Sequence, residues 1–291
     1  MIHSVTLAAP AKINLHLDIQ ERRSDGFHDL RSLFVMIDLY DELTATQTGE
    51  WGCSIEGCNH IPMEKNLIWK AYTRYCEAAG QPIGLAVSCR KQIPEMAGLG
   101  GGSSDAAAML RIMQLVHPVA IPQGKLKSIA AELGSDVPFF LSSASALVEG
   151  RGEIIEPIDT PQQYCCVIVK PELDVSTGEA YHRLDAYSGP QPAPLSLREV
   201  YDNYLQPPQS WRFFNSFTAV LSAEYPQLNS YLQVLRRNGA EYANVSGSGS
   251  ALFGVFRDSE AAESCYLLLK KDIKKVWKVK MLASLTEAVY N

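Results

Sequence analysis

The sequence predicts an α+β fold, and two observations support that prediction. Segments typical of strands and of helices follow one another without the regular strand–helix–strand alternation of a doubly wound parallel sheet. The chain has 291 residues, 46% of them hydrophobic and 20% charged, which is the size and balance of a globular protein with one large or two ordinary domains. We expect two domains, 1–157 and 158–291, although the boundary is only weakly marked.

The N-terminal half shows the clearest local signals. Residues 66–79 have helical spacing, with Asn66 in a position to cap the first turn and Gly80 in a position to end the helix. Gly134 likewise marks the end of a second helix. In this half we expect a strand or hairpin arm at 2–19, an apolar stretch at 30–40 and a short strand at 85–89. We expect helices at 66–79, 104–116 and 124–133.

The C-terminal half is more irregular. Residues 186–211 hold five prolines and little periodicity, which predicts a segment rich in loops. The glycines at 150 and 152 predict the turn of a hairpin, and those within 244–256 predict a tight turn before a strand. Further strands are expected at 165–169 and 276–282, and helices at 213–223, 227–237 and 259–271.

Composition excludes several classes of function. The formal net charge is −6, which weighs against a general binder of nucleic acid or of anionic membranes, since such proteins usually carry a basic face. We find neither a secretory leader pattern nor a run of 18 apolar residues. The seven cysteines lack the spacing of a zinc site, so we expect reduced thiols in a cytoplasmic protein.

The stretch 93–107, IPEMAGLGGGSSDAA, is the most informative part of the sequence. A glycine loop that opens a buried helix presents free N–H groups at the positive end of the helix dipole, and this arrangement binds phosphate. The loop lacks the lysine of a P-loop, and Ser103 stands where a dinucleotide-binding fingerprint needs glycine. By itself the pattern leaves open a flexible turn.

The motif P-x-x-x-G-L-G-G-G-S-S-x-A-A resembles the central motif of the GHMP kinases. PAKINLHLDI at 10–19 resembles their N-terminal motif, and NVSGSGSALFGVF at 244–256 resembles their C-terminal glycine motif. The resemblance implies the GHMP kinase fold, with an S5-like N-terminal domain and a ferredoxin-like C-terminal domain. It also implies ATP and Mg²⁺ as cofactors and an alcohol group as the phosphoryl acceptor.

Four further stretches are similar to one branch of this family, whose substrate is a small polyol linked to cytidine diphosphate. They are RRSDGFHDLRSLF, EKNLIWKA, LGSDVPFFL and VEGRGE. The alternatives left open are a homoserine-type or mevalonate-type kinase, a relative that binds ligands without catalysis, and an RNA-binding protein of related fold. The sequence does not decide between a monomer and a homodimer, and we expect neither a nucleic acid nor a membrane as partner.

The resemblance places Lys12 and Asp136 at the substrate hydroxyl. A carboxylate can accept the proton that the hydroxyl loses as it attacks the γ-phosphate, and a lysine beside it stabilises the developing negative charge. Read without the family, Asp136 is an ordinary loop residue and Lys12 a solvated lysine on a strand.

The same resemblance assigns the other site residues. The expected ATP-binding residues are Asn66, Leu67, Pro94, Glu95, Met96, Ala97, Gly98, Leu99, Gly100, Gly101, Gly102, Ser103 and Ser104. The expected substrate-binding residues are Asn14, Phe27, His28 and Tyr181, with Phe27 and Tyr181 as the two stacking faces for cytosine and His28 reading its edge. Phe27 replaces the tyrosine common in the family. The protein ligand of Mg²⁺ is not assigned, although Ser104 is a candidate.

Overall fold

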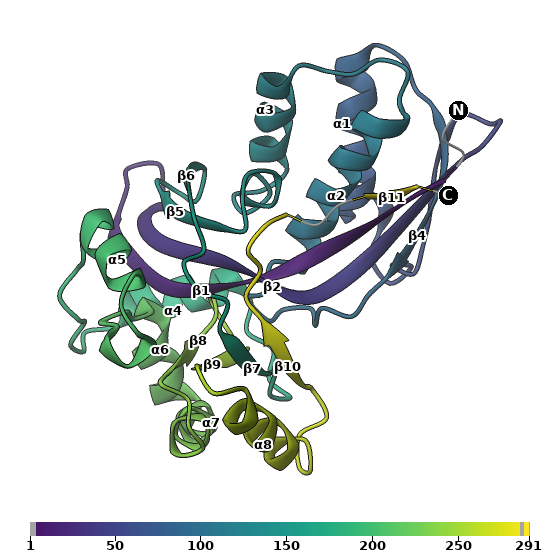
Figure 1. Ribbon diagram of the computed structural model, residues 1–291. Helices are drawn as coiled ribbons and strands as arrows, with labels where there is room; N and C mark the ends of the chain where they lie inside the picture. The colour runs from purple at the N-terminus through teal and green to yellow at the C-terminus, as the bar shows by residue number, and fades with distance from the viewer. Residues whose placement is uncertain (1–3, 286–287, 291) are drawn as a thin grey trace.

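A computed structural model describes residues 4–285 and 288–290, and Figure 1 shows two sheets with helices packed against each. The larger sheet has seven strands in the order β11-β1-β2-β4-β3, with β5 pairing with β2 and β6 pairing with β5. Its strands are β1 (Ser4–Arg22), β2 (His28–Gln47), β3 (Gly52–Glu56), β4 (Gly84–Arg90), β5 (Ser145–Glu149), β6 (Ile154–Ile158) and β11 (Ala288–Tyr290).

Three helices cover one face of the larger sheet, α1 (Leu67–Ala79), α2 (Gly101–Val116) and α3 (Gln123–Leu133). α2 is buried along most of its length because its alanines and leucines face the sheet on one side and α1 on the other. This burial holds the first turn of α2, and with it the end of the glycine stretch, in a fixed position.

The smaller sheet has four antiparallel strands in the order β10-β7-β9-β8. Numbered along the chain, this is the 4-1-3-2 order of a ferredoxin-like sheet. Its strands are β7 (Cys165–Val169), β8 (Tyr242–Val245), β9 (Leu252–Phe256) and β10 (Val276–Lys280). The helices of this half are α4 (Thr177–Ala186), α5 (Leu197–Tyr204), α6 (Ser216–Glu224), α7 (Pro226–Arg237) and α8 (Ser259–Leu269).

These elements confirm the α+β prediction and most of the expected segments. Asn66 accepts a hydrogen bond from the Ile68 N–H at 2.9 Å, and Gly80 ends α1 at a φ of 78°. α2 begins at Gly101 rather than at the expected residue 104, because Gly100 at φ 72° serves as the N-cap and the next two glycines are already helical.

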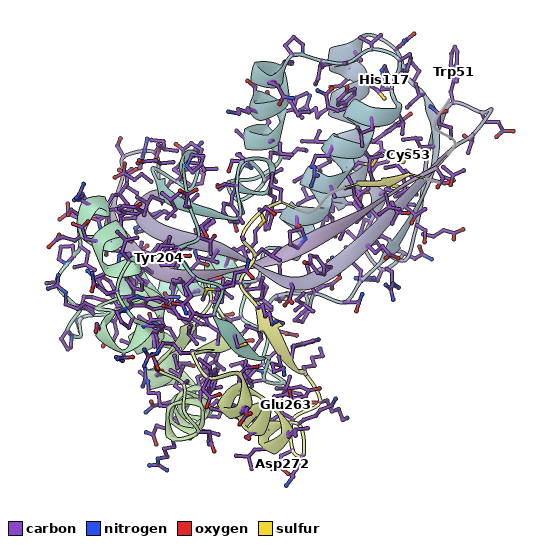
Figure 2. All side chains as sticks on the ribbon, in the orientation of Figure 1. Trp51, Cys53, His117, Tyr204, Glu263 and Asp272 are labelled. Carbon is purple, nitrogen blue, oxygen red and sulfur yellow. The ribbon has the colours of Figure 1, made fainter. Side chains whose placement is uncertain are left out.

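The prediction of a loop-rich segment at 186–211 is wrong in part, because this segment contains α5. Ser196 and Glu199 form a reciprocal capping box at its start, and Val200 and Tyr204 bury one face. Figure 2 labels Tyr204, whose ring packs near Trp211 at a centroid distance of 6.1 Å. The prolines on both sides obscured this short helix in the sequence. The helix α4 and the strands β3 and β11 were not predicted either.

The long strands β1 and β2 run through the centre of the molecule and change register three times (Figure 1). One shift lies between Pro10 and Ala11, where two residues of β2 have no partner on β1. Directly after this irregularity, the Lys12 N–H donates to the Leu99 carbonyl at 2.9 Å. This hydrogen bond ties the glycine stretch to β1.

His16 gives the fold a predictable dependence on pH. Its ring is fully buried against Phe213 and Phe214, its Nε2 atom has no hydrogen-bond partner among the described residues, and burial lowers its pKa to about 4. Below the ordinary pKa of 6.5, the unfolded chain therefore binds a proton at this residue that the folded chain does not bind. The stability that the neutral His16 contributes is therefore fully present above pH 6.5 and is lost as the pH falls toward 4.

We expect His16 to account for a loss of about 2 kcal/mol in the free energy of unfolding between pH 7.5 and pH 5. Urea titrations of the wild type and of His16→Leu at both values measure this, because the variant should lose that share of the pH dependence. His182→Leu, which removes an exposed histidine, should behave like the wild type. Equal pH dependence in the wild type and His16→Leu would contradict the assignment.

Candidate active site

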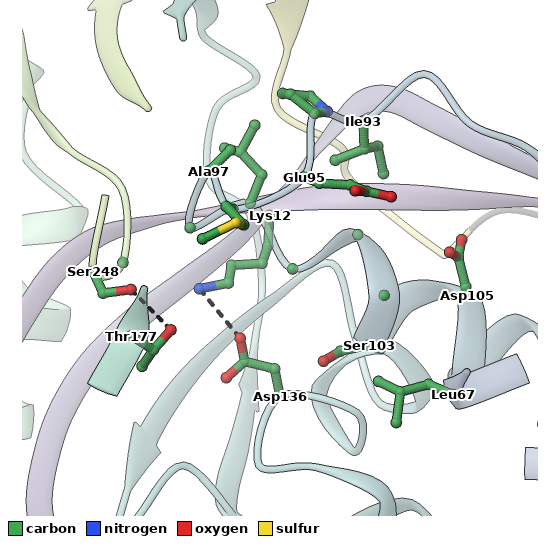
Figure 3. Close-up of a pocket in the computed structure, with 18 of the residues that line it drawn as sticks. Lys12, Leu67, Ile93, Glu95, Ala97, Ser103, Asp105, Asp136, Thr177 and Ser248 are labelled. Atoms are coloured by element: carbon green, nitrogen blue, oxygen red, sulfur yellow. Dashed lines mark hydrogen bonds and ion pairs between the residues drawn. The ribbon is translucent and has the colours of Figure 1, made fainter. Parts of the chain in front are cut away.

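A cavity of about 460 Å³ lies where the glycine stretch meets β1, α1 and the first residues of α4. Figure 3 shows Lys12 and Asp136 pointing toward one another in this cavity, with Ser103 and Leu67 on one side and Thr177 and Ser248 on the other. Every residue of the expected ATP set lines the cavity except Ser104, which is buried in the first turn of α2.

The glycine stretch approaches other parts of the backbone so closely that two of its glycines leave no room for a side chain. Gly98 and Gly100 both have a φ of 72°, which favours glycine. A Cβ atom on Gly98 would lie 2.0 Å from the Ser246 carbonyl oxygen, and one on Gly100 would lie 2.9 Å from the Phe140 ring. These positions are therefore restricted to glycine by geometry as well as by backbone conformation.

Hydrogen bonds tie this stretch to the turn between β8 and β9. The Ser246 hydroxyl donates to the Gly98 carbonyl at 3.0 Å, and the Ala251 N–H donates to the Ala97 carbonyl at 3.1 Å. The Asn215 amide in turn donates to the Val245 and Gly247 carbonyls at 2.9 and 2.8 Å. The two glycine motifs of the sequence thus form one connected wall of the cavity.

The start of α2 faces the cavity without a side-chain cap, since its N-cap residue is Gly100. The N–H groups of the first helical turn have no acceptors within their own helix. Together with the helix dipole, they provide an environment that favours an anion such as phosphate. The Ser103 side chain adds a hydroxyl at the same end of the cavity.

Lys12 and Asp136 form an ion pair, with 3.4 Å between Nζ and Oδ2. Lys12 is 4% exposed, donates to the Asn14 Oδ1 at 2.6 Å and lies 4.6 Å from the centroid of the Phe34 ring. Asp136 lies in the loop between α3 and a short 3₁₀ turn, and its side chain is 32% exposed. A rigid buried ammonium group is thus paired with a carboxylate that a ligand in the cavity can reach.

A buried charged cluster that sequence reasoning missed supports the entry to the glycine stretch. Asp41 at the centre of β2 is fully buried and accepts the N–H groups of Gln92 and Ile93 at 2.6 and 2.8 Å. Lys91 pairs with Asp41 and with Asp105, the latter at 2.7 Å. Burial raises the pKa of Asp105, and the positive charge of Lys91 opposes that increase.

Two of the four expected substrate-binding residues line the cavity, and the other two do not. Asn14 and Tyr181 line the cavity, and the Tyr181 ring lies between His28 and Phe217, at centroid distances of 5.3 and 5.0 Å. His28 borders a neighbouring hollow, where its Nε2 lies 3.0 Å from Asp185. Phe27 is 54% exposed, with the Arg151 guanidinium 4.8 Å from its ring.

The structure also adds residues on the side of the cavity opposite Ser103. Thr177 at the start of α4 lies 3.2 Å from the Ser248 hydroxyl, and Gly247 lines the wall beside them. The motif at 244–256 marked the turn that holds Gly247 and Ser248, whereas Thr177 had no recognisable signal in the sequence. Burial raises the pKa of the nearby Tyr181 to about 12, so its hydroxyl is neutral at physiological pH.

Two features are absent from the described part of the chain. Among residues 4–285 and 288–290, no three histidine, cysteine, aspartate or glutamate side chains are grouped so that they could hold a metal ion. Over the same residues, none of the helices has the length and apolarity needed to cross a membrane.

Comparison with known proteins identifies the family. The model of the GHMP kinases N terminal domain matches residues 66–144, and that of the GHMP kinases C terminal matches residues 208–274. A 4-diphosphocytidyl-2-C-methyl-D-erythritol kinase of Nitratidesulfovibrio vulgaris (strain DP4) is 38% identical over 279 residues, covering 93% of this chain and 96% of the relative. The enzyme of the same name from Treponema pallidum (strain Nichols) is 35% identical over 279 residues, which again cover 93% of this chain and 96% of the relative.

Solved structures agree with these matches. A crystal structure of 4-(cytidine 5'-diphospho)-2C-methyl-D-erythritol kinase has a TM-score of 0.81 and 33% identity, covering 95% of this chain and 98% of that one. A homoserine kinase from Cytophaga hutchinsonii shares the fold, with a TM-score of 0.73 and 19% identity. The chain therefore belongs to the GHMP kinases, in the family of 4-diphosphocytidyl-2-C-methyl-D-erythritol kinases.

Proposed function

We propose that this kinase transfers the γ-phosphoryl group of ATP to the 2-hydroxyl of 4-diphosphocytidyl-2-C-methyl-D-erythritol, in the non-mevalonate pathway to isoprenoid precursors. The observation that carries the proposal is the pairing of Lys12 with Asp136 beside the uncapped start of α2. The full-length similarity to enzymes of that name supports the choice of acceptor. We also propose domains 1–157 and 158–291, with the reaction in the cavity that both of them line.

The glycine stretch binds the ATP phosphates in this proposal. The backbone N–H groups from Leu99 to Ser103 face the phosphate oxygens, and the fixed turn around Gly98 keeps them in place without reorganisation. Asn66, Leu67 and Pro94 to Ala97 line the part of the cavity that would receive the nucleoside. Phosphoryl transfer needs little covalent chemistry from the protein, so positioning and electrostatics supply most of the rate.

Mg²⁺ is the metal expected with ATP, and it neutralises charge on the β- and γ-phosphates when bound. The described residues offer no preformed cage of carboxylates, which suits an ion held largely by phosphate oxygens and water. The Ser104 hydroxyl is buried at the start of α2 without a hydrogen-bond partner among the described residues, which makes it one candidate ligand for the ion.

Lys12 and Asp136 act on the acceptor hydroxyl. The Asp136 carboxylate takes the proton as the hydroxyl oxygen attacks phosphorus, and the partly exposed position of Asp136 lets a substrate reach it. Lys12 pairs with Asp136 and stabilises negative charge on the attacking oxygen. Its contacts with Asn14 and Phe34 hold the ammonium group in one orientation.

The cytidine end of the acceptor would bind next to Tyr181. Asn14 faces the polyol, His28 reads the base edge, and Phe27 and Tyr181 provide its two stacking faces. The exposed Phe27 has to move against the base for this sandwich to form. Binding energy from the base then positions the hindered tertiary hydroxyl for transfer.

Phe27→Ala should raise KM for the cytidine substrate about tenfold, because one base-stacking contact is worth ~1–3 kcal/mol. KM for ATP should change little, and steady-state kinetics with each substrate varied in turn measures both. Trp51→Ala is the matched control, since Trp51 is an aromatic residue that is 83% exposed and does not line the cavity. Equal changes in the two KM values would remove Phe27 from the base pocket.

Coupled ADP release by the purified protein with Mg·ATP tests the proposed reaction. We expect turnover with 4-diphosphocytidyl-2-C-methyl-D-erythritol and none with homoserine, mevalonate or galactose. Turnover with another acceptor would leave the assignment of the phosphate loop in place and would refute the cytidine pocket.

Two further properties can be addressed separately. All seven cysteines are free thiols, which supports a cytoplasmic location. Gel filtration would decide between a monomer and a homodimer.

A further inference from the structure

Two cysteines of the hydrophobic core, Cys58 and Cys89, lie beside the cavity, and the proposed reaction uses neither of them. Cys58 lines the cavity and is 4% exposed, and Cys89 in β4 is 3% exposed. Parallel pairing of Glu56 with Ser88 brings residue 57 opposite Cys89. Residue 57 is glycine, and a Cβ there would lie 1.9 Å from the Cys89 carbonyl oxygen. Cys58 follows directly after this close approach, and its thiol forms a hydrogen bond with that of Cys89.

The hydrogen bond between the two thiols and the nearby Lys91 favour a thiolate at Cys58. The hydrogen bond with the Cys89 thiol is the main reason that the pKa of Cys58 lies below its usual range, and the positive charge of Lys91 lowers it further. Burial and the negative charge of Asp41 oppose this decrease. The same interaction raises the pKa of Cys89, so the pair ionises at Cys58.

The other thiols of this domain differ in the property that controls reactivity. Cys53 lies in β3, the strand that ends the order β11-β1-β2-β4-β3, and is partly exposed, but burial of its sulfur raises its pKa to about 12. Burial also raises the pKa of Cys76 in α1. Because the thiolate is the nucleophile, exposure and reactivity should not follow the same order in this domain.

We propose that Cys58 is a modification site for small, uncharged, soft electrophiles that enter through the nucleotide cavity, and that the adduct blocks the nucleoside end of that cavity. The inference rests on the proposed function only in taking the cavity as the ATP site. With iodoacetamide as the electrophile, the Cys58 sulfur attacks the methylene carbon, an S–C bond forms, the C–I bond breaks and iodide leaves. The thiol proton passes to solvent, and no oxidant is needed.

Limiting iodoacetamide at pH 7 on the intact protein tests the proposal, with peptide mass spectrometry to locate the adduct and kinase assays on the same samples. We expect Cys58 to carry the first equivalent, ahead of the more exposed Cys53, and activity to fall in step with its modification. Mg·ATP at ten times its Kd should slow the modification of Cys58 about tenfold, since about a tenth of the sites stay free.

Three variants test the roles of Cys58 and Cys89, with Cys53 as the control thiol. After treatment, Cys58→Ser should keep most of its own starting activity, whereas Cys53→Ser should be inactivated as the wild type is. Cys89→Ala should slow the alkylation of Cys58, because it removes the group that favours the thiolate.

Four results would overturn the proposal: first modification at Cys53 or another thiol, full activity after complete modification of Cys58, no protection by Mg·ATP, or an unchanged rate in Cys89→Ala. The adduct and its protection are read by mass and need no phosphoryl acceptor. A wrong choice of acceptor would therefore leave these two results intact, which separates failure of this inference from failure of the proposed reaction.

Discussion

Asp136→Asn should lower kcat by about 10²–10⁴-fold, the range that a positioned general base contributes. The amide keeps the size of the side chain and a hydrogen bond to the substrate hydroxyl, but it cannot take the proton. The substitution also removes the negative charge that pairs with Lys12. Among the described contacts of its ammonium group, those with the Asn14 amide oxygen and the Phe34 ring remain. KM for ATP should change much less than kcat, because the phosphate loop is untouched, and coupled ADP release measures both.

Ser135→Ala is the matched control for this experiment, because it removes a hydroxyl from the adjacent residue of the same loop. It should retain nearly full turnover. Circular dichroism and urea unfolding should show that both variants are folded, since the Asp136 side chain is 32% exposed and Lys12 keeps its buried hydrogen bond to Asn14. Near-normal turnover in a folded Asp136→Asn protein would refute the assignment of Asp136 as the base.

Gly98→Ala should lower kcat/KM for ATP by at least about 100-fold, since a shift of about 1 Å in a positioning element can cost that much. The added methyl would lie 2.0 Å from the Ser246 carbonyl oxygen, at a φ of 72° that alanine disfavours. A backbone carbonyl cannot rotate away as a flexible side chain can, so the glycine stretch and the turn after β8 must separate. Isothermal titration with ATP measures the lost binding directly.

Gly124→Ala is the control for Gly98→Ala, because nothing lies within 4 Å of a Cβ at that position in the first turn of α3. It should bind ATP as the wild type does. If Gly98→Ala binds ATP normally, the close approach to Ser246 does not control the phosphate site. If Gly98→Ala fails to fold, as thermal unfolding would show, the contact is structural rather than specific to nucleotide binding.

Local signals predicted a large part of the fold. The Asn66 cap and the Gly80 terminator act within a single turn of chain, so the bounds of α1 could be read directly from the sequence. The run of apolar residues at 165–169 likewise predicted β7 with the bounds that the structure gives. The α5 helix was missed because eight residues with only two buried side chains give almost no periodic signal between prolines.

The site was predictable to the extent that motifs marked it. The structure brings Lys12, Asp136 and nearly all of the expected ATP residues to one cavity, while their roles in binding and catalysis stay predictions. The cluster of Asp41, Lys91 and Asp105 could not be derived in this way, because three separate elements bring its members together. No spacing in the sequence predicts a contact between a residue in β2, a residue directly after β4 and a residue in the first turns of α2.

The hydrogen bonds from Ser246 and Ala251 to the glycine stretch have a mechanical consequence. The glycine stretch is held from both sides, by β1 at Leu99 and by the turn between β8 and β9 at Ala97 and Gly98. Moving the smaller sheet away from β1 would therefore break hydrogen bonds of the glycine stretch itself. The N-terminal half expressed alone would lose the bonds from Ser246 and Ala251, and with them one of the two supports of this stretch.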